Sequence, residues 1–385
     1  MIRTLWNRLA PNPRFLGGIS LLLLVGILIA CLWPFRAPRN TASWLAGRPG
    51  IAFGSHGVLL SSDQLTVAGD RETASCSLEL WLESDGTRDM GSILAIYSPE
   101  NPRQFTVSQW RTGLALRSVA VGDPVRMGGA PSFTSDVFTP GKTVFVTITS
   151  SERGTEVYVG GNLLNVTHGF QITNGMLTGK VVAGTAASAD DNWGGQLRGL
   201  AIYNRALNPA QVRNHYTTWT SNGRPGASDL DGLLALYLFK ESTGRTVHSE
   251  VPGGSDLYVP ERYVVPAKDV LSAPTLDNWD DIIKNIVGFL PFGFTLCGYF
   301  VSAGRRRSAV VVTTVICGAL SLFVESLQAF LPTRDSSMTD VLTNLLGGAI
   351  GALLYHWADS RWNVGPGQLD SHAGISASGL LQGNR

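Results

Sequence analysis

Long apolar runs lie near both ends of the chain, and short apolar runs separated by turn residues fill its middle. The first long run, Phe15 to Trp33, is uncharged, and three more follow at residues 282–302, 308–330 and 339–357. A helix needs about 20 largely apolar residues to cross a bilayer. The pattern therefore predicts four membrane-spanning helices, one at the start of the chain and three near its end.

The arginines predict the direction of each span. Arg3, Arg8 and Arg14 precede the first apolar run, and the triplet Arg305-Arg306-Arg307 follows the second. Short loops rich in arginine and lysine stay on the cytoplasmic side of a membrane. Both ends of the chain are therefore expected in the cytoplasm of a prokaryotic-type cell, with residues 36–279 outside it.

The first apolar run has two other interpretations. Basic residues before a short apolar stretch also describe a cleaved signal peptide. The string Leu28-Ile29-Ala30-Cys31 resembles a lipoprotein processing site with Cys31 as the lipid acceptor. Because four-residue matches of this kind are common in apolar helices, a retained membrane helix is the favoured interpretation.

The middle of the chain has the alternating pattern of β-strands. Leucine occupies every second position of Ser77 to Glu83, and Thr143 to Thr149 is rich in β-branched and aromatic residues. A turn follows that second run, Thr155 to Val159 returns, and Gly160-Gly161-Asn162 forms the next turn, which predicts a hairpin. Many short strands at this spacing predict a two-sheet β-sandwich.

Composition supports a membrane protein and excludes some partners. Only 15% of the 385 residues are charged, and the net charge of +1 gives no reason to expect a nucleic-acid partner. Of the four cysteines, only Cys76 lies in the polar middle, so an internal disulfide is not expected there. No cysteine or histidine grouping suggests a metal site.

Three segments of the middle region resemble laminin G-like, concanavalin A-like jelly rolls. They are the run Leu197 to Val212, the hairpin end Val157 to Gly161, and Leu236 to Glu241 with the turn that follows it. The resemblance covers roughly residues 50–260. It implies a concanavalin A-like jelly-roll sandwich, a fold that serves lectins, adhesion modules and glycanases.

Two groups of residues in this region are candidates for chemistry. Glu79 and Glu83 share one strand face, as paired glycanase carboxylates would. Trp81 stands between them where the resembling glycanases have an aspartate, so two solvent-facing glutamates are the favoured interpretation. Asp190-Asp191-Asn192-Trp193 offers oxygen ligands for a structural calcium ion and an aromatic ring for sugar stacking, although a polar turn explains the same residues. No other cofactor is expected.

The last third of the chain holds ionisable side chains within apolar spans, where burial of charge is costly. Glu325 lies about five residues from the outer end of its span, or roughly 8 Å deep. The predicted topology places six polar side chains near the outer leaflet as one ligand-binding site: Asn285, Glu325, Gln328, Arg334, Asp340 and Asn344. Taken singly, Asp340 could only stabilise a helix N-terminus, and Glu325 could be a structural partner of Arg334 or Asn344.

The spacing of these residues resembles VanZ-like membrane proteins. The matching pattern is Glu325-x-x-Gln328-x-Phe330-x-Pro332-x-Arg334, then Asp340-x-x-x-Asn344-x-x-Gly347-x-x-x-Gly351, with Asn285 and Phe289 to Gly293 on the preceding helix. The resemblance covers about residues 278–357 and implies a role in resistance to glycopeptide antibiotics of the teicoplanin kind. The long insertion after the first helix departs from the family's short pattern.

The expected domain order is therefore a cytoplasmic segment and first helix at 1–35, an extracytoplasmic sandwich at 36–265, a VanZ-like membrane domain at 266–358 and a disordered cytoplasmic tail at 359–385. The favoured function is that of a non-enzymatic envelope protein. Its sandwich would bind a glycan or surface polymer, and its bundle would bind a polar ligand or membrane-lipid headgroup.

Two alternatives remain open at this stage. In the first, a membrane enzyme acts on a lipid-linked saccharide, with Glu325 and Asp340 as acid and base and Arg334 holding a phosphate. A transporter is the second and weaker alternative, because four helices make a thin translocation path.

Overall fold

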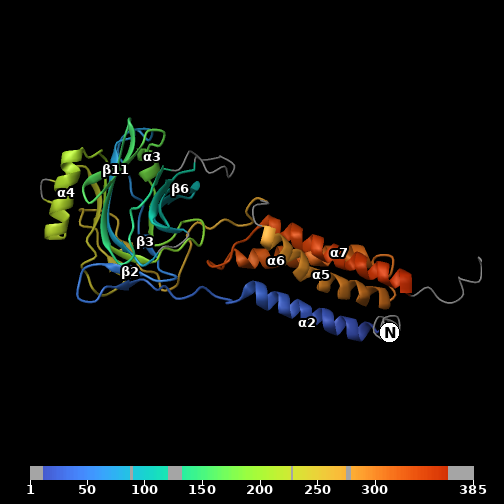
Figure 1. Ribbon diagram of the computed structural model, residues 1–385. Helices are drawn as coiled ribbons and strands as arrows, with labels where there is room; N and C mark the ends of the chain where they lie inside the picture. The colour runs from blue at the N-terminus through green and yellow to red at the C-terminus, as the bar shows by residue number, and fades with distance from the viewer. Residues whose placement is uncertain (1–11, 87–89, 120–131, 227–228, 275–278, 363–385) are drawn as a thin grey trace, which may run out of the picture. The chain divides into compact units, whose positions relative to one another are not determined.

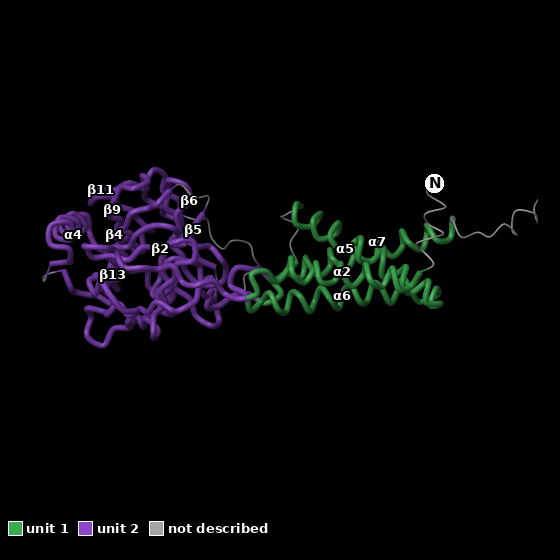
Figure 2. Tube along the Cα trace, turned by 90° about the horizontal axis from the view of Figure 1, so that it is seen from below, with its two compact units in different colours: residues 1–35, 270–330, 336–385 green, residues 36–269, 331–335 purple. Residues whose placement is uncertain are grey.

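The computed structural model describes residues 12–86, 90–119, 132–226, 229–274 and 279–362. The chain divides into two compact units (Figure 2). One unit comprises residues 1–35, 270–330 and 336–385, and the other comprises residues 36–269 and 331–335. The predicted tail lies outside the described residues from residue 363 onward.

The second unit is a sandwich of two antiparallel sheets (Figure 1). One sheet has the order β1-β2-β13-β4-β9-β10-β11, with β14 also paired to β13, and the other has the order β15-β16-β3-β12-β5-β6-β7-β8. The first-sheet strands are β1 (Ser43–Trp44), β2 (Ile51–Phe53), β13 (Gly195–Tyr203), β4 (Cys76–Ser84), β9 (Thr143–Ser151), β10 (Gly154–Val159), β11 (Asn162–Thr167) and β14 (Leu233–Tyr237). The second-sheet strands are β15 (Thr246–Val247), β16 (Leu257–Tyr258), β3 (Leu59–Ser61), β12 (Lys180–Ala183), β5 (Gly91–Ser98), β6 (Asn101–Trp110), β7 (Gly113–Arg117) and β8 (Ser132–Thr134).

The predicted hairpin between β9 and β10 is present, and a second tight turn follows it. Val159 pairs with Val146 on one side and with Asn162 on the other, so Gly160 and Gly161 form a two-residue turn. Both glycines have positive φ, 57° and 77°. Two-residue hairpin turns of this type require positive φ at both positions, which glycine adopts without steric cost.

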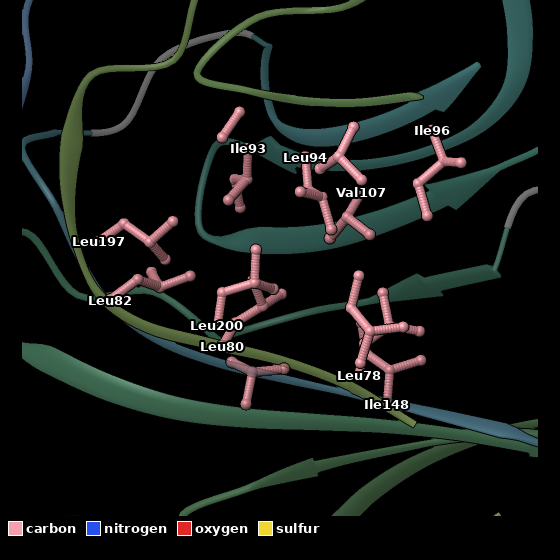
Figure 3. Close-up of a cluster of buried hydrophobic side chains, with 14 of the residues drawn as sticks. Leu78, Leu80, Leu82, Ile93, Leu94, Ile96, Val107, Ile148, Leu197 and Leu200 are labelled. Carbon is pink, nitrogen blue, oxygen red and sulfur yellow. The ribbon is translucent and has the colours of Figure 1, made fainter. Parts of the chain in front are cut away.

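Leucines at alternate positions build the core between the sheets. Leu78, Leu80 and Leu82 of β4 are fully buried, and they face side chains of the second sheet such as Ile96 and Val107 (Figure 3). The period of two along β4 therefore puts its leucines inward and its intervening Glu79, Trp81 and Glu83 on the opposite face. The sandwich prediction is confirmed.

Helix α4 (Pro209–Asn222) covers the outer face of the first sheet. It begins at the capping box of Asn208 and Gln211 and ends at Gly223, whose φ of 70° allows the left-handed cap. Trp219 of α4 packs on Phe145 and directly over Gly199, where a Cβ would lie 2.3 Å from the indole. The short helix α3 (Asn174–Leu177) is the sandwich's other α-helix within the described residues.

The first unit is a bundle of four helices whose length and composition suffice to cross a membrane. They are α2 (Pro13–Leu32), α5 (Trp279–Ser302), α6 (Ala309–Gln328) and α7 (Met338–Trp362), which run side by side in Figures 1 and 2. Each contains most of a predicted span, and the boundaries differ by a few residues, as helix ends commonly do.

The first helix is a packed member of this bundle. Ser20 of α2 donates from its Oγ to Thr295 Oγ1 of α5 at 3.1 Å, and a Cβ on Gly17 would lie 3.2 Å from the ring of Tyr299. Leu16 joins the buried cluster of Cys297, Ala309, Ala352 and Tyr355. These contacts give the N-terminal helix a packing role in the structure.

Helices α5 and α7 approach closely along a seam of glycines. A Cβ on Gly347 would lie 2.4 Å from the carbonyl oxygen of Ile286, and one on Gly351 would lie 2.1 Å from that of Leu290. A Cβ on Gly293 would likewise lie 2.2 Å from the carbonyl oxygen of Gly348. Small residues allow helix backbones to approach this closely, which is a common basis of helix association in membranes.

Candidate functional site

Helix α6 carries a stripe of buried polar side chains, Ser321, Glu325 and Gln328, near the end that leads to α7. Glu325 is 3% exposed, and its Oε2 accepts a hydrogen bond from the backbone N–H of Ser337 at 2.9 Å. The Ser336 hydroxyl donates to the Glu325 carbonyl at 2.9 Å. Ser337 also caps α7, because its Oγ accepts from the Thr339 N–H at 3.0 Å. The buried carboxylate is therefore joined directly to the start of the next helix.

Two further hydrogen bonds link α7 to its neighbours within this region. Asn285 of α5 donates from Nδ2 to Asp340 Oδ1 at 2.8 Å, and both side chains are half-buried. Asn344, one turn further along α7, donates from Nδ2 to Ser321 Oγ of α6 at 2.9 Å. Residues from three helices thus meet at one end of the bundle. That Asn285, Asp340 and Asn344 bind a ligand there stays a prediction.

Gln328 makes a different contact, and Arg334 belongs to the other unit. The Gln328 amide donates from Nε2 to the carbonyl oxygen of Cys31 at the end of α2, at 3.0 Å. Arg334 lies in the segment Leu331–Asp335, which groups with the sandwich, and its N–H donates to the Leu331 carbonyl at 3.1 Å. The role of Arg334 as a phosphate ligand stays a prediction.

The connection between α6 and α7 is tied to the segment that precedes α5. Ser272 donates from its N–H to the Ser336 carbonyl at 3.0 Å, and Met338 donates from its N–H to the Ser272 carbonyl at 3.1 Å. The N–H of Leu271 also donates to Ser336 Oγ at 3.2 Å. Ser272 and Ser337 thus pair in parallel, and the same Ser337 donates its N–H to the Glu325 carboxylate.

Sequence reasoning missed Ser321, Ser336 and Ser337. Ser321 lies one turn before Glu325, so the four-residue spacing on a helix face could have identified it. The stripe continues through Cys317 and Thr313, both fully buried. Ser336 and Ser337 lie in a loop, where no periodicity indicates which side chains meet a carboxylate.

On the sandwich, neither sequence interpretation describes Glu79. Its side chain is fully buried beneath α4. Its Oε1 receives a hydrogen bond from His215 Nδ1 at 2.9 Å, and its Oε2 receives bonds from the Tyr203 hydroxyl at 3.1 Å and from Trp219 Nε1 at 3.0 Å. Glu79 therefore joins α4 to the sheet and is neither a solvent-facing side chain nor an accessible glycanase carboxylate.

Glu83 is also engaged in structural contacts. Its Oε2 lies 2.9 Å from Arg198 Nη2 and accepts a bond from Thr143 Oγ1 at 3.1 Å. Trp81, which lies between the two glutamates, contacts the Trp219 ring edge-on and the Arg198 guanidinium. The face that carries both glutamates is thus filled by protein side chains.

The predicted calcium segment lies in a hydrogen-bonded loop. Asp190 Oδ1 accepts from the Tyr263 hydroxyl at 2.7 Å, and Asp191 Oδ2 accepts from Ser92 Oγ at 2.6 Å. Burial raises the pKa of Asp191 above its usual value, and the bond from Ser92 partly offsets that rise. Trp193 is buried in the core, so it cannot stack on a sugar as its sequence position suggested.

No group of three or more histidine, cysteine, aspartate or glutamate side chains is arranged for a metal within the described ranges. Calcium also accepts carbonyl and amide oxygens. The calcium interpretation stays a prediction.

An exposed aromatic pair lies on the second sheet. Trp110 at the end of β6 is 45% exposed and Phe133 of β8 is 41% exposed, and their rings meet edge-on with centroids 5.3 Å apart. A Cβ on Gly113 would lie 2.3 Å from the Phe133 ring, so the glycine makes room for it. Exposed aromatic rings offer apolar faces to a ligand that also carries hydroxyl groups.

Comparison with known families gives two matches in different parts of the chain. Residues 54–213 match the concanavalin A-like lectin/glucanases superfamily, and residues 232–359 match the VanZ/LLP1 family. Protein VanZ of Enterococcus faecium is 31% identical over 86 residues, which are 22% of this chain and 50% of that protein. The chain thus spans half the length of this curated relative.

Solved structures similar to the chain have low sequence identity. A candidate carbohydrate-binding protein from Bacteroides ovatus is 11% identical with a TM-score of 0.39, over 58% of each chain. A pentraxin from Limulus polyphemus is 16% identical with a TM-score of 0.35, over 58% of this chain and 93% of its own. On the two family matches and its own architecture, the chain combines a concanavalin A-like sandwich with a VanZ-like membrane domain.

Proposed function

We propose that this protein acts in the cell envelope, with an extracytoplasmic sandwich that binds a glycan and a helical bundle that binds a polar ligand or lipid headgroup at the outer leaflet. The observation that carries the proposal is the polar cluster of Asn285, Glu325, Asp340 and Asn344 at one end of helices of membrane-spanning length. Ionisable side chains within spans are costly and commonly belong to ligand or ion sites.

The chemistry of this cluster suits a headgroup with both donor and acceptor groups. Glu325 and Asp340 supply carboxylate oxygens, which accept hydrogen bonds from hydroxyl, amide or ammonium groups. Asn285 and Asn344 supply amides that donate and accept. A saccharide or amine-bearing headgroup offers those partners. The glycine seam, which begins about two turns along α7 from Asp340, keeps α5 and α7 close to each other.

Ligand-dependent stability of the full chain in nanodiscs tests the bundle site. The probes are a lipid-linked disaccharide, its polyprenyl phosphate carrier and the free disaccharide. A ligand that binds only the folded state raises the melting temperature. We expect one probe to raise it in the wild type but not in Glu325→Gln or Asp340→Asn, whereas Asp281→Asn, an exposed carboxylate on α5, keeps the response. Equal responses in all four proteins would refute the site.

The sandwich offers Trp110 and Phe133 for glycan binding. Both aromatic residues are distant in the sequence from the buried Glu79. Stacking of a sugar on their rings needs no catalytic carboxylate. Full-length protein is applied to an array of envelope polysaccharides and peptidoglycan fragments, as wild type, Trp110→Ala and the control Tyr258→Ala, which removes another exposed aromatic side chain. Loss of a glycan signal in Trp110→Ala alone supports glycan binding at Trp110 and Phe133, and a retained signal contradicts it.

The orientation is tested by labelling intact cells with a membrane-impermeant maleimide in a Cys31→Ser background. Thr243→Cys places a thiol on an exposed turn of the sandwich, and Arg307→Cys places one in the loop between α5 and α6. We expect Thr243→Cys to react in intact cells and Arg307→Cys to react only after permeabilisation. The reverse pattern would overturn the proposed sidedness.

An enzyme acting on a lipid-linked saccharide is the second candidate, and the burial of Glu325 favours it. A carboxyl group that is shielded from bulk water and held by hydrogen bonds has the fixed position that proton transfer to a substrate requires. Incubation of the lipid-linked disaccharide with the protein in nanodiscs, followed by mass spectrometry, separates the two candidates. Turnover that Glu325→Gln abolishes without loss of binding would establish catalysis, and intact substrate would leave binding alone.

A further inference from the structure

The end of the bundle opposite the polar cluster gathers three arginine-bearing segments. The start of α2 and the end of α7 lie at the same end of the bundle in both views (Figures 1 and 2). Leu16 of α2, Ala309 of α6 and Tyr355 of α7 share one buried cluster there, together with Cys297 of α5. The loop between α5 and α6 therefore lies beside both helix ends.

The charge at this end is strongly one-sided. Arg14, Arg305, Arg307 and Arg361 are exposed, and we call these four the arginine belt. In the stretches 12–20, 299–313 and 353–361, which form this end, Asp359 is the only acidic residue.

Asp359 forms an ion pair with a fifth arginine, Arg306, and so does not neutralise the charge of the arginine belt. Its side chain is 2% exposed, and its Oδ2 lies 2.6 Å from Arg306 Nη1. A buried carboxylate needs such a partner, because removal from water is costly for an unpaired charge. Arg306 thus ties the loop to α7, while Arg305 and Arg307, its neighbours on either side, remain exposed to the surroundings.

Exposed aromatic side chains at this end are of the types that are common at a membrane interface. Trp357 is 55% exposed, and the guanidinium of Arg361 lies over its ring at 5.7 Å from the centroid. Tyr299 of α5 is also exposed. Tryptophan and tyrosine concentrate at the headgroup level of bilayers, where arginine meets lipid phosphates.

We propose that the arginine belt binds the headgroups of anionic phospholipids. A cluster of basic side chains beside spans attracts anionic lipid by about fivefold in affinity per arginine. The absence of any other carboxylate from these three stretches leaves the belt's charge available to a phosphate, and the Arg306–Asp359 pair fixes the loop that carries two of its members.

Native mass spectrometry of the full chain in detergent, titrated with phosphatidylglycerol or with phosphatidylcholine of the same acyl chains, tests the proposal. We expect the wild type to prefer phosphatidylglycerol. The double variant Arg305→Gln/Arg307→Gln should bind its first phosphatidylglycerol about 25-fold more weakly, since two arginines are lost, and phosphatidylcholine equally well. Arg305→Lys/Arg307→Lys keeps the charge and should keep most of the preference.

The matched control is Arg71→Gln/Arg153→Gln, which removes two exposed arginines from the sandwich and so changes the net charge equally. It should retain the wild-type preference. The proposal is overturned if the wild type binds both lipids alike, if the belt variant keeps its preference, or if the control loses it to the same extent. Helical circular dichroism of each variant confirms that the bundle is folded before lipid is added.

Discussion

The glycine seam between α5 and α7 predicts that one added methyl group separates two helices. A Cβ on Gly351 would lie 2.1 Å from the carbonyl oxygen of Leu290 and 2.7 Å from the backbone nitrogen of Phe294. Carbon and oxygen atoms in contact are normally more than 3 Å apart, so the backbones must move apart by about 1 Å. Neither atom belongs to a flexible side chain that could rotate away.

The size of the effect follows from two opposing contributions. Overpacking a close interface costs about 1–3 kcal/mol, and a backbone obstacle favours the upper end of that range. Alanine is a better helix former than glycine by about 1 kcal/mol, which partly offsets the cost. Gly351→Ala should therefore lower the free energy of unfolding by about 2 kcal/mol.

Gly288→Ala is the matched control on α5. A Cβ at Gly288 meets no atom within 4 Å, so the substitution should leave stability unchanged or raise it by up to about 1 kcal/mol. Helical circular dichroism during reversible unfolding in mixed sodium dodecyl sulfate and maltoside micelles measures both proteins. If Gly351→Ala were as stable as Gly288→Ala, the close approach of α5 and α7 would be wrong.

Three further predictions concern the sandwich. Glu79→Gln should destabilise it by about 3 kcal/mol in urea unfolding followed by fluorescence, because an amide cannot accept bonds from His215, Tyr203 and Trp219 as the carboxylate does; unchanged stability would contradict this role. The bond from the Ser249 N–H is the main cause that lowers the pKa of Asp256, so the ionised Asp256 stabilises the fold at neutral pH and this stabilisation is lost as the pH falls through the lowered pKa. Asp256→Asn should therefore flatten the acid side of a plot of melting temperature against pH, and an unaltered acid side would argue against it. Burial raises the pKa of Cys76 to about 12, so maleimide should label this thiol only when urea unfolds the sandwich, and rapid labelling of the native protein would show that the core is open.

Local sequence patterns were sufficient for the elements and the fold class. The four apolar runs predicted α2, α5, α6 and α7, and the alternation of leucines predicted which face of β4 is buried. Both patterns act over one helix or one strand, since they depend on the period with which side chains return to the same side. The glycines at 160 and 161 similarly marked a turn that only positive φ allows.

Only the tertiary structure decided which polar groups meet. Asp340 bonds to Asn285, 55 residues earlier, and Glu79 bonds to Trp219, 140 residues later. Glu79 and Glu83 are the same residue type on the same face of β4. Glu79 is nevertheless enclosed by α4, whereas Glu83 is held by Arg198. The sequence determines the direction of a side chain within its own element, whereas the element that packs against it, and hence its burial and its partners, depends on contacts between distant segments.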